Sequence, residues 1–336
     1  MSSQKINIFY LLPFVFIGLP RTTYGQLALF EPIEKNKTLL IVGQDLGAIG
    51  GFAKPNNDGY VDHIELVPGG ITSYTSIPSL GGLNESTNYG CGDIDAKAII
   101  QNRKFDNSVL VLGLYLVNEL KNINQGEYDI TIREMGEWIK AAKRPVFLRI
   151  GYEFDGEWNH HDPEAYQLAY RRIVNIFRST YVENCATVWQ STGRFDTTYL
   201  MQWYPGDDYV DWVGYSHFDN FGEATLQIAR NHHKPVMIAE STPLHLQTDE
   251  GNPHDVWNQW FIPFFNQIHA NSDIIRAVAY INADWESQPM WAGQNWGDSR
   301  IQENEFIKKK WLEEISSDFW LNASPSLFQQ LNQDTW

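Results

Sequence analysis

"RPVFLRIGYEFDGEWNHH", residues 144 to 161, joins a buried β-strand pattern directly to a run of carboxylates. The stretch begins with apolar residues and continues into Glu153, Asp155 and Glu157. Acidic residues at the end of a buried strand are typical of a parallel sheet whose strand ends form a ligand site. The stretch therefore predicts both the kind of sheet and the place of the functional residues.

Short β-branched runs recur along the chain and alternate with helical patterns, in which apolar residues stand three or four positions apart. The eight strand candidates are LLIVGQD (39–45), GGITSYTSI (69–77), SVLVLGLYL (108–116), PVFLRIGYE (145–153), CATVWQST (185–192), DWVGYSHFD (211–219), PVMIAEST (235–242) and IIRAVAYINADW (274–285). Alternation of this kind predicts a parallel sheet, and eight repeats predict its closure. We therefore expect an α/β fold, a single-domain (β/α)8 TIM barrel.

Polar residues gather at the carboxyl ends of these strand candidates. They are Gln44, Asp45, Glu153, Gln190, His217, Asp219, Glu240 and Asp284. In a barrel of parallel strands the carboxyl ends meet on one face, where the active site lies. We expect these residues to converge there although they are far apart in the sequence.

Glu153 and Glu240 end the fourth and seventh strand candidates. Two carboxyl groups on either side of a glycosidic bond can divide the work, one protonating the leaving oxygen and the other attacking the anomeric carbon. A single glutamate at a strand end is more often solvated or ion-paired. We assign Asp155 and Glu157, in the loop after Glu153, to solvent or hydrogen-bonding roles. The pair predicts glycoside hydrolysis with retention.

The composition favours a neutral, flat ligand. Aromatic residues make up 14 % of the 336 residues, with 13 Trp and 16 Tyr, and the formal net charge is −16. Aromatic rings suit the apolar faces of sugars, whereas the negative charge repels nucleic acids and anionic membranes. We therefore expect a polysaccharide or oligosaccharide substrate and no nucleic-acid partner.

The first 25 residues have the pattern of a secretion signal peptide, with Lys5 before an apolar stretch at 6–19. No later segment is long and apolar enough to predict stable membrane insertion. We expect a secreted protein, extracellular or periplasmic, with the catalytic barrel at 26–320 and a C-terminal tail at 321–336. We also expect a monomer in which Cys91 and Cys185 lie at opposite ends of the barrel as unpaired thiols.

Several longer motifs stand in a characteristic order along the chain. They are KTLLIVGQ (37–44), RIGYEFDGEW (149–158), DPEAY (162–166), YRRIV (170–174), WYPGDDYVDWVG (203–214) and KPVMIAE (234–240). In their order and spacing the chain resembles glycoside hydrolase family 26, a β-mannanase-like family in the clan of retaining (β/α)8 enzymes. The resemblance spans nearly the whole chain after the leader.

The resemblance implies roles for individual residues. It makes Glu153 the acid/base and Glu240 the nucleophile, and it places Tyr215 as a hydrogen-bond donor to the nucleophile. Trp158 and Trp285 resemble the ring platforms on which family members stack sugar units. We expect no cofactor.

The chain departs from the family at Tyr152. Members typically carry a histidine at this position, just before the acid/base, where it contacts the sugar next to the cleaved bond. The resemblance as a whole implies an endo-acting enzyme on β-mannan or, given this departure, on a related β-linked glycan.

Further strand-end residues are candidates to contact the substrate. Gln44 and Asp45 follow the first strand, and His217 ends the sixth, where it either binds substrate or packs in the core. Trp189 is either a sugar platform or part of the barrel filling. Arg149 points either into the site, where it would lower the pKa of the nucleophile, or into a structural ion pair.

No metal site is predicted. The pairs His160-His161 and His232-His233 place neighbouring side chains in different directions, and no third ligand stands at a suitable spacing. No glycine-rich phosphate loop follows a strand candidate. Two alternatives to hydrolysis stay open, a catalytically silent carbohydrate-binding protein on the same barrel and a transglycosylase.

Overall fold

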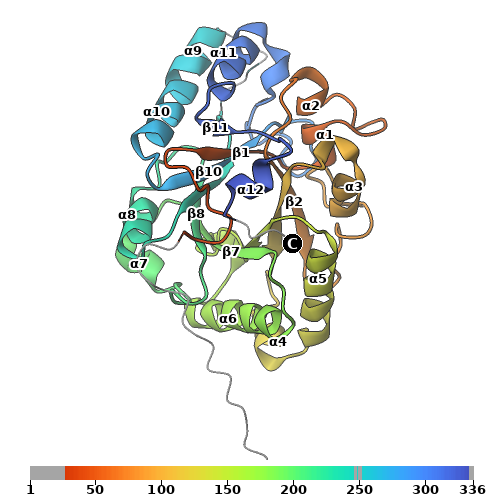
Figure 1. The fold of residues 1–336 in the computed structure, drawn as a ribbon, viewed down its shortest axis with the longest axis vertical. Coiled ribbons are helices and arrows are strands. Elements are labelled where there is room, and N and C mark those ends of the chain that lie inside the picture. Colours follow the sequence, from red (N-terminus) through yellow and green to blue (C-terminus); the bar gives the residue numbers. More distant parts are fainter. Residues whose placement is uncertain (1–26, 246–247, 249–251, 333–336) are drawn as a thin grey trace, which may run out of the picture.

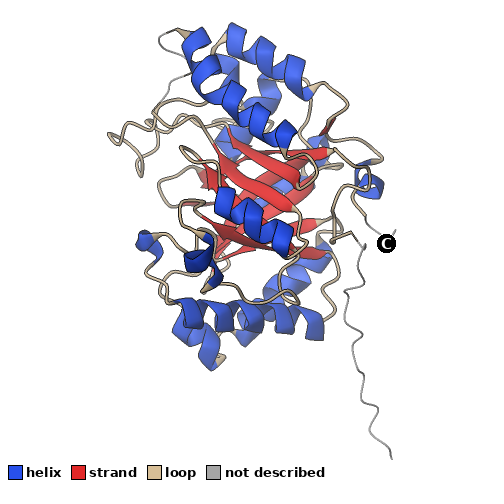
Figure 2. Ribbon diagram, turned by 90° about the vertical axis from the view of Figure 1, so that its left-hand side faces the viewer, coloured by secondary structure: helices blue, strands red, loops and turns tan. Residues whose placement is uncertain are grey.

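The computed structural model describes residues 27–245, 248 and 252–332, and in it eight parallel strands close into a barrel (Figures 1 and 2). The strands are β1 (Thr38–Gly43), β2 (Gly70–Ser76), β5 (Val109–Tyr115), β6 (Val146–Ile150), β7 (Cys185–Ser191), β8 (Trp212–His217), β9 (Val236–Ser241) and β10 (Ile275–Ile281). Each pairs with the next, and β10 pairs with β1. The predicted single-domain (β/α)8 barrel is confirmed. Seven of its strands fall within their predicted ranges, and β1 begins one residue before its range, at Thr38.

Helices surround the barrel (Figure 2). The α-helices are α1 (Leu46–Ile49), α2 (Tyr60–His63), α3 (Ala96–Gln101), α4 (Leu120–Gln125), α5 (Asp129–Ala141), α6 (Pro163–Ser179), α7 (Thr197–Met201), α8 (Glu223–Asn231), α9 (Pro253–Val256), α10 (Ile262–Ala270), α11 (Glu305–Ile315) and α12 (Leu327–Gln330). A π-helical turn, η3 (Trp257–Phe261), joins α9 to α10, and three 3-10 turns are η1 (Arg103–Phe105), η2 (Glu157–Asn159) and η4 (Ile301–Glu303). The long α6 begins at its cap residue Asp162, whose carboxylate accepts a hydrogen bond from Ala165 N.

The strands are buried on both faces, as expected for a parallel sheet between two layers. Alternate residues of β1 enter two different clusters of the core. Leu39 and Ile41 join the cluster of strand residues that fills the barrel. Leu40 and Val42 join the cluster that also contains helix residues, and they therefore lie under the outer layer.

The amino end of the barrel is closed by both ends of the described chain. Phe30 packs edge-on against Phe147, and Phe147 packs edge-on against Trp212. The short strand β11 (Trp320–Leu321) pairs with β1, and Leu327 of α12 is fully buried in the same cluster. The beginning of the segment that the sequence analysis treated as a tail is thus packed against the barrel (Figure 1).

The carboxyl ends of the strands carry most of the irregular structure. The strands end between one and four residues earlier than the sequence predicted, because the chain changes direction there. After β6, both Gly151 and Glu153 have positive φ angles, 56° and 52°. A small hairpin, β3 (Thr87–Asn88) and β4 (Asp93–Ile94), follows β2 on this side.

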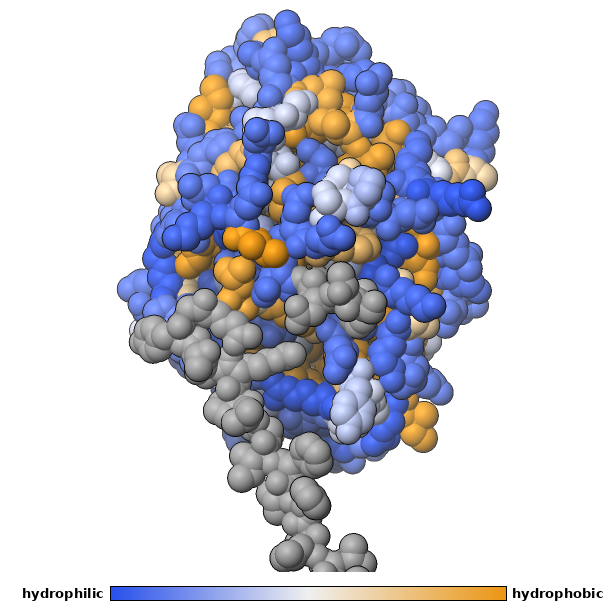
Figure 3. Space-filling model, viewed as in Figure 1, coloured by the Kyte–Doolittle hydropathy of each residue, from blue (hydrophilic) through white to orange (hydrophobic). Residues whose placement is uncertain are grey.

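No helix in the described ranges is long and apolar enough to cross a membrane. The side seen in Figure 3 is mostly hydrophilic, with separate hydrophobic patches. The predicted signal peptide lies outside the described residues. Cys91 and Cys185 are free thiols, Cys91 between β3 and β4 and Cys185 at the start of β7.

Candidate active site

Glu153 stands in a loop that is fastened at several points. The Asn159 side chain donates a 2.6 Å hydrogen bond to the backbone carbonyl of Glu153. Two residues on, the Asp155 carboxylate accepts hydrogen bonds from the amide and hydroxyl of Thr192, which follows β7. The left-handed backbone of Glu153 is therefore held in place, and its carboxyl group points toward β8, where Ser216 Oγ donates to Oε1 at 2.6 Å.

Glu240 belongs to β9 and is bound by two donors on the same oxygen. Arg149 Nη1 lies 2.5 Å from Glu240 Oε1, and the Tyr74 hydroxyl lies 2.9 Å from it. The described hydrogen bonds leave Oε2 of Glu240 unused. One carboxylate oxygen is thus fixed by the barrel while the other is available to a ligand.

A chain of hydrogen bonds connects the two glutamates through the barrel interior. Arg149 Nη1 donates to Gln190 Oε1 at 3.0 Å, Gln190 Nε2 lies 3.1 Å from Ser216 Oγ, and Ser216 donates to Glu153. Side chains from β6, β7 and β8 thereby connect the Glu240 carboxylate to the Glu153 carboxyl group. The fold brings together the two acidic residues that stand 87 positions apart in the sequence.

The two carboxyl groups have different surroundings. Burial raises the pKa of Glu153 to about 8, with a further contribution from the negative charge of Glu240. Glu240 is paired with the fully buried cation of Arg149. Glu153 is thus set up to carry a proton near neutral pH, whereas Glu240 lies in an ion pair.

Arg149 is itself held between two aromatic rings. Its guanidinium carbon lies 5.0 Å from the centre of the Tyr74 ring and 5.2 Å from that of Tyr152. Among the described residues neither Nε nor Nη2 has a hydrogen-bond partner, and the two rings lie beside the guanidinium. Gly113 of β5 makes this possible, because a Cβ at that position would lie 2.5 Å from the Tyr74 ring and 2.8 Å from Arg149 Nη2.

Two carboxyl groups linked through one polar network fit the chemistry predicted from the sequence, and sequence comparison identifies the family. A model of glycosyl hydrolase family 26 matches residues 114–255, which include both glutamates. The beta-1,3-xylanase TXYA from Vibrio sp. is 36% identical over 326 residues, covering 87% of this chain and 68% of that protein. The chain belongs to glycosyl hydrolase family 26. A beta-1,3-xylanase from Alcaligenes sp. is 33% identical over 338 residues, covering 92% of this chain and 70% of that protein.

Solved structures from family 26 share the fold. A double mutant of the Cellulomonas fimi endo-beta-1,4-mannanase superposes with a TM-score of 0.64 at 17% identity, covering 88% of this chain and 75% of that one. At this identity the likeness concerns the architecture. Membership of family 26 makes the protein a glycoside hydrolase, and its substrate class is a polysaccharide.

The structure places Tyr74, and not Tyr215, beside Glu240. Side chains alternate along β8, so Ser216 faces the barrel interior and Tyr215 faces the helices. The Tyr215 hydroxyl makes no hydrogen bond to Glu240. The role predicted for Tyr215 is therefore wrong. Tyr74, on β2, donates that hydrogen bond to Glu240 instead.

Of the two tryptophans predicted as platforms and Trp189, for which a platform was one of two readings, only Trp158 offers a ring surface. Trp158 is 56% exposed in the loop after β6. Trp285 is 2% exposed and packs against Trp291 and Trp296, and Trp189 is fully buried and stacks on Phe154. Trp189 and Trp285 therefore support the core, and as placed they cannot stack on a sugar.

The remaining candidates divide between the site and its support. Gln44 Oε1 lies 2.9 Å from the Tyr74 hydroxyl oxygen, so Gln44 borders the site, as does Tyr152. Asp45 instead caps α1, accepting from the amides of residues 47 and 48, and burial raises its pKa to about 6. His217 packs among the rings of residues 221, 260 and 264, and burial lowers its pKa to about 4.

Sequence reasoning missed three members of the site, which are Tyr74, Gln190 and Ser216. Gln190 was identified as a polar strand end but was not assigned to the site. Tyr74 and Ser216 lie inside their strands, before the strand ends. Because side chains alternate along a strand, their direction toward the barrel interior was the signal that could have identified them. In the strand register, Arg149 pairs with Gly113, and Gly113 pairs with Tyr74. The three residues therefore lie in the same layer of the barrel.

Among the described residues, no cluster of His, Cys, Asp or Glu could hold a metal ion. Of the paired histidines, His232 bonds to Asp207 with 2.7 Å between Nδ1 and Oδ1, and burial lowers the pKa of His161 to about 4. The glutamate chemistry described above needs no metal.

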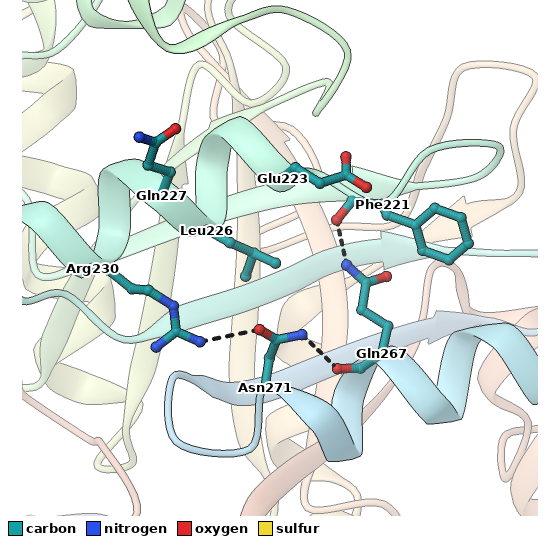
Figure 4. Close-up of a pocket in the computed structure, with 7 residues that line it drawn as sticks. All are labelled: Phe221, Glu223, Leu226, Gln227, Arg230, Gln267 and Asn271. Carbon is teal, nitrogen blue, oxygen red and sulfur yellow. Dashed lines mark hydrogen bonds between the residues drawn. The ribbon is translucent and has the colours of Figure 1, made fainter.

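An open groove of about 460 Å³ lies elsewhere, on the outer wall between α8 and α10 (Figure 4). Its lining residues are Phe221, Glu223, Leu226, Gln227, Arg230, Gln267 and Asn271. Their side chains bond mainly to one another, as in the 3.1 Å contact from Arg230 Nη2 to Asn271 Oδ1. None of the predicted site residues lines this groove.

Replacing Gly113 by Ala tests the arginine sandwich. The new methyl group collides with Tyr74 and Arg149, so we expect the activity on any glycan substrate to fall by at least about tenfold. Overpacking also lowers the free energy of unfolding, by about 1–3 kcal/mol. Gly136→Ala in α5, where the added Cβ would lie 2.9 Å from Val182, is the matched control. It should lose stability without loss of kcat, and equal activity losses in both variants would contradict the arrangement.

The pH dependence tests the protonation of Glu153. The acid/base role predicted for Glu153 needs its proton, so kcat/KM should fall as the pH rises through about 8, the raised pKa of this group. The hydrogen bond from Ser216 favours the charged form and lowers this pKa. Ser216→Ala should therefore move the alkaline limb to higher pH, measured from initial rates across the range. A limb that moves to lower pH would contradict the assignment.

Proposed function

We propose that the protein is a secreted endo-β-1,3-xylanase that hydrolyses its substrate with retention of configuration. The observation that carries the substrate class is the pair of beta-1,3-xylanases from Vibrio and Alcaligenes, which are 36% and 33% identical over most of this chain. The mannanase structure with the same fold is 17% identical. β-Mannan, the substrate considered from the family resemblance, is the second candidate.

In the first step of the proposed mechanism, Oε2 of Glu240 attacks the anomeric carbon. Glu153 gives its proton to the glycosidic oxygen, which leaves with the electron pair of the broken C–O bond. The product is a covalent glycosyl intermediate on Glu240 and a shortened chain with a free hydroxyl. The unused oxygen of Glu240 and the raised pKa of Glu153 both support these roles.

In the second step Glu153, now ionised, takes a proton from water. The water oxygen attacks the anomeric carbon from the opposite side and displaces Glu240. Two inversions give net retention. Arg149 and Tyr74 keep the Glu240 carboxylate in position throughout, since both bind Oε1.

Exposed rings at successive strand ends support an extended glycan site. Tyr115 ends β5, Trp158 follows β6 and Phe195 follows β7, and each ring is exposed. Because β5, β6 and β7 are neighbours in the barrel, the three rings lie on the same side of the carboxyl end. We propose that they stack against sugar units on either side of the cleaved bond.

Secretion forms part of the proposal and is supported by the leader pattern in residues 1–25. A polymeric substrate outside the cell requires export of the enzyme. Amino-terminal sequencing of the protein recovered from the culture medium would show a start near Gln26.

Azide rescue tests the two catalytic roles. With an aryl β-1,3-xylobioside, Glu240→Ala should lose at least about 1000-fold in kcat and regain turnover with azide, forming the α-glycosyl azide. Glu153→Ala should form the β-glycosyl azide, because azide then attacks the covalent intermediate. NMR of the product distinguishes the anomers.

Glu157→Ala provides the control for azide rescue, because Glu157 is exposed in the same loop and takes no part in the proposed chemistry. It should keep the activity of the unmodified enzyme. An inactive Glu157 variant, or the same azide anomer from both glutamate variants, would contradict the roles.

A panel of polysaccharides tests the substrate. We expect kcat/KM on β-1,3-xylan to exceed that on β-1,4-mannan and β-1,4-xylan by at least about tenfold. Release of reducing ends and mass spectrometry of the oligosaccharides provide the measurement, and proton NMR should show the β-anomer first. Preferential cleavage of mannan would replace β-1,3-xylan by the second candidate while leaving the glutamate chemistry intact.

A further inference from the structure

Asp45 lies where three loops of the carboxyl end meet. Its Oδ1 accepts hydrogen bonds from Gly47 N at 2.8 Å and Ala48 N at 3.0 Å, which fixes the start of α1. Its Oδ2 accepts from Gln288 Nε2 at 3.3 Å, in the loop after β10. Asp45 is 4% exposed, so these contacts are made inside the protein.

The β3–β4 hairpin (Thr87–Ile94) packs directly on the same carboxylate. A Cβ at Gly92 would lie 2.3 Å from Asp45 Cγ, so residue 92 has no room for a side chain. The φ angle of 94° at Gly92 independently favours glycine. Nearby, Met290 N donates a 2.8 Å hydrogen bond to Gly90 O, which joins the hairpin to the loop after β10.

The hairpin borders the catalytic centre through Asp45, because Oε1 of the preceding residue, Gln44, lies 2.9 Å from the Tyr74 hydroxyl that is also 2.9 Å from Glu240 Oε1. The Cys91 thiol lies close enough to Asp45 and to Tyr152 to interact electrostatically with both. Tyr152 in turn interacts with both Glu153 and Glu240. The tip of the hairpin therefore lies near Tyr152, whose ring packs edge-on against the Tyr74 ring beside Glu240.

We propose that Asp45 is a positioning residue that joins the β3–β4 hairpin and the loop after β10 into one wall of the substrate site. The wall contacts the sugar unit beside Tyr152. The inference rests on the proposed glycanase activity and adds to it the residue that sets the position of this wall. Asp45, which the sequence suggested as a substrate contact, acts through the loops and does not touch the sugar.

The geometry also predicts which substitution preserves the wall. Asparagine is as good a helix cap as aspartate, and its oxygen can accept from the two amides of α1. Its amide nitrogen would then face Gln288, whose Oε1 is buried without a hydrogen-bond partner and can accept after rotation of the Gln288 amide. Asp45→Asn should therefore keep the junction, whereas Asp45→Ala removes all three hydrogen bonds.

The two cysteines allow a test that does not depend on activity. Cys91 is partly buried in the hairpin, whereas Cys185 is 8% exposed in β7. Release of the hairpin should increase the rate at which a maleimide labels Cys91, and it should leave Cys185 protected. The labelled residue is identified by peptide mass spectrometry of the intact enzyme after timed reaction.

We expect Asp45→Ala to label at Cys91 about tenfold faster, with Cys185 unchanged. On β-1,3-xylo-oligosaccharides its KM should rise about tenfold while kcat changes by less than about threefold, because the glutamates are not displaced. Asp45→Asn should resemble the unmodified enzyme in both measurements. Gly92→Ala should resemble Asp45→Ala, and it provides a second route if Asp45→Ala does not fold.

Three outcomes would overturn the proposal. One is an unchanged labelling rate at Cys91 in both Asp45→Ala and Gly92→Ala. Another is faster labelling of Cys91 and Cys185 together with a lower melting temperature, which indicates general destabilisation. The third is faster labelling of Cys91 with an unchanged KM on the preferred substrate, which would show that the hairpin does not contribute to the substrate site. If β-mannan proves to be that substrate, KM is measured on manno-oligosaccharides instead. The labelling test stays the same, since it does not depend on the glycan.

Discussion

A buried ion pair between Arg149 and Glu240 organises the carboxyl end of this barrel. Two charges can be removed from water only if they are paired and their remaining polar atoms have partners or aromatic cover. Here Nη1 of Arg149 donates hydrogen bonds to side-chain oxygens of Glu240 and Gln190, and two tyrosine rings lie beside the guanidinium. Gly113 leaves the space that this packing needs. The Arg149 cation is thus surrounded by residues of five strands, β2, β5, β6, β7 and β9.

Local patterns predicted the barrel and the central residues of the site. β-Branched runs and helical spacing are properties of short segments, so all eight strands could be located from the sequence. Glu153, Glu240 and Arg149 were found because the polar ends of parallel strands must meet on one face. The alternative open for Arg149 is now decided, since it forms an ion pair and also lies in the site.

Exposure and direction of side chains were harder to predict. Whether a tryptophan after a strand is a platform or core depends on distant loops, and the loop after β10 folds back so that Trp291 and Trp296 cover Trp285. Tyr215 and Tyr74 differ only in parity, because one faces the helices and the other the barrel interior. The register between strands, which decides this, is set by pairing and not by any one segment.

Both donors to Glu240 reach the same oxygen, and this has a consequence for how a reaction would end. In the proposed chemistry the free oxygen bonds to the sugar, so Oε1 becomes the carbonyl oxygen of an ester while keeping Arg149 and Tyr74 as partners. Hydrogen bonds to that carbonyl draw electrons away from the ester linkage and make the carboxylate a better leaving group. The barrel is thus built for release of the glycan as well as for its capture.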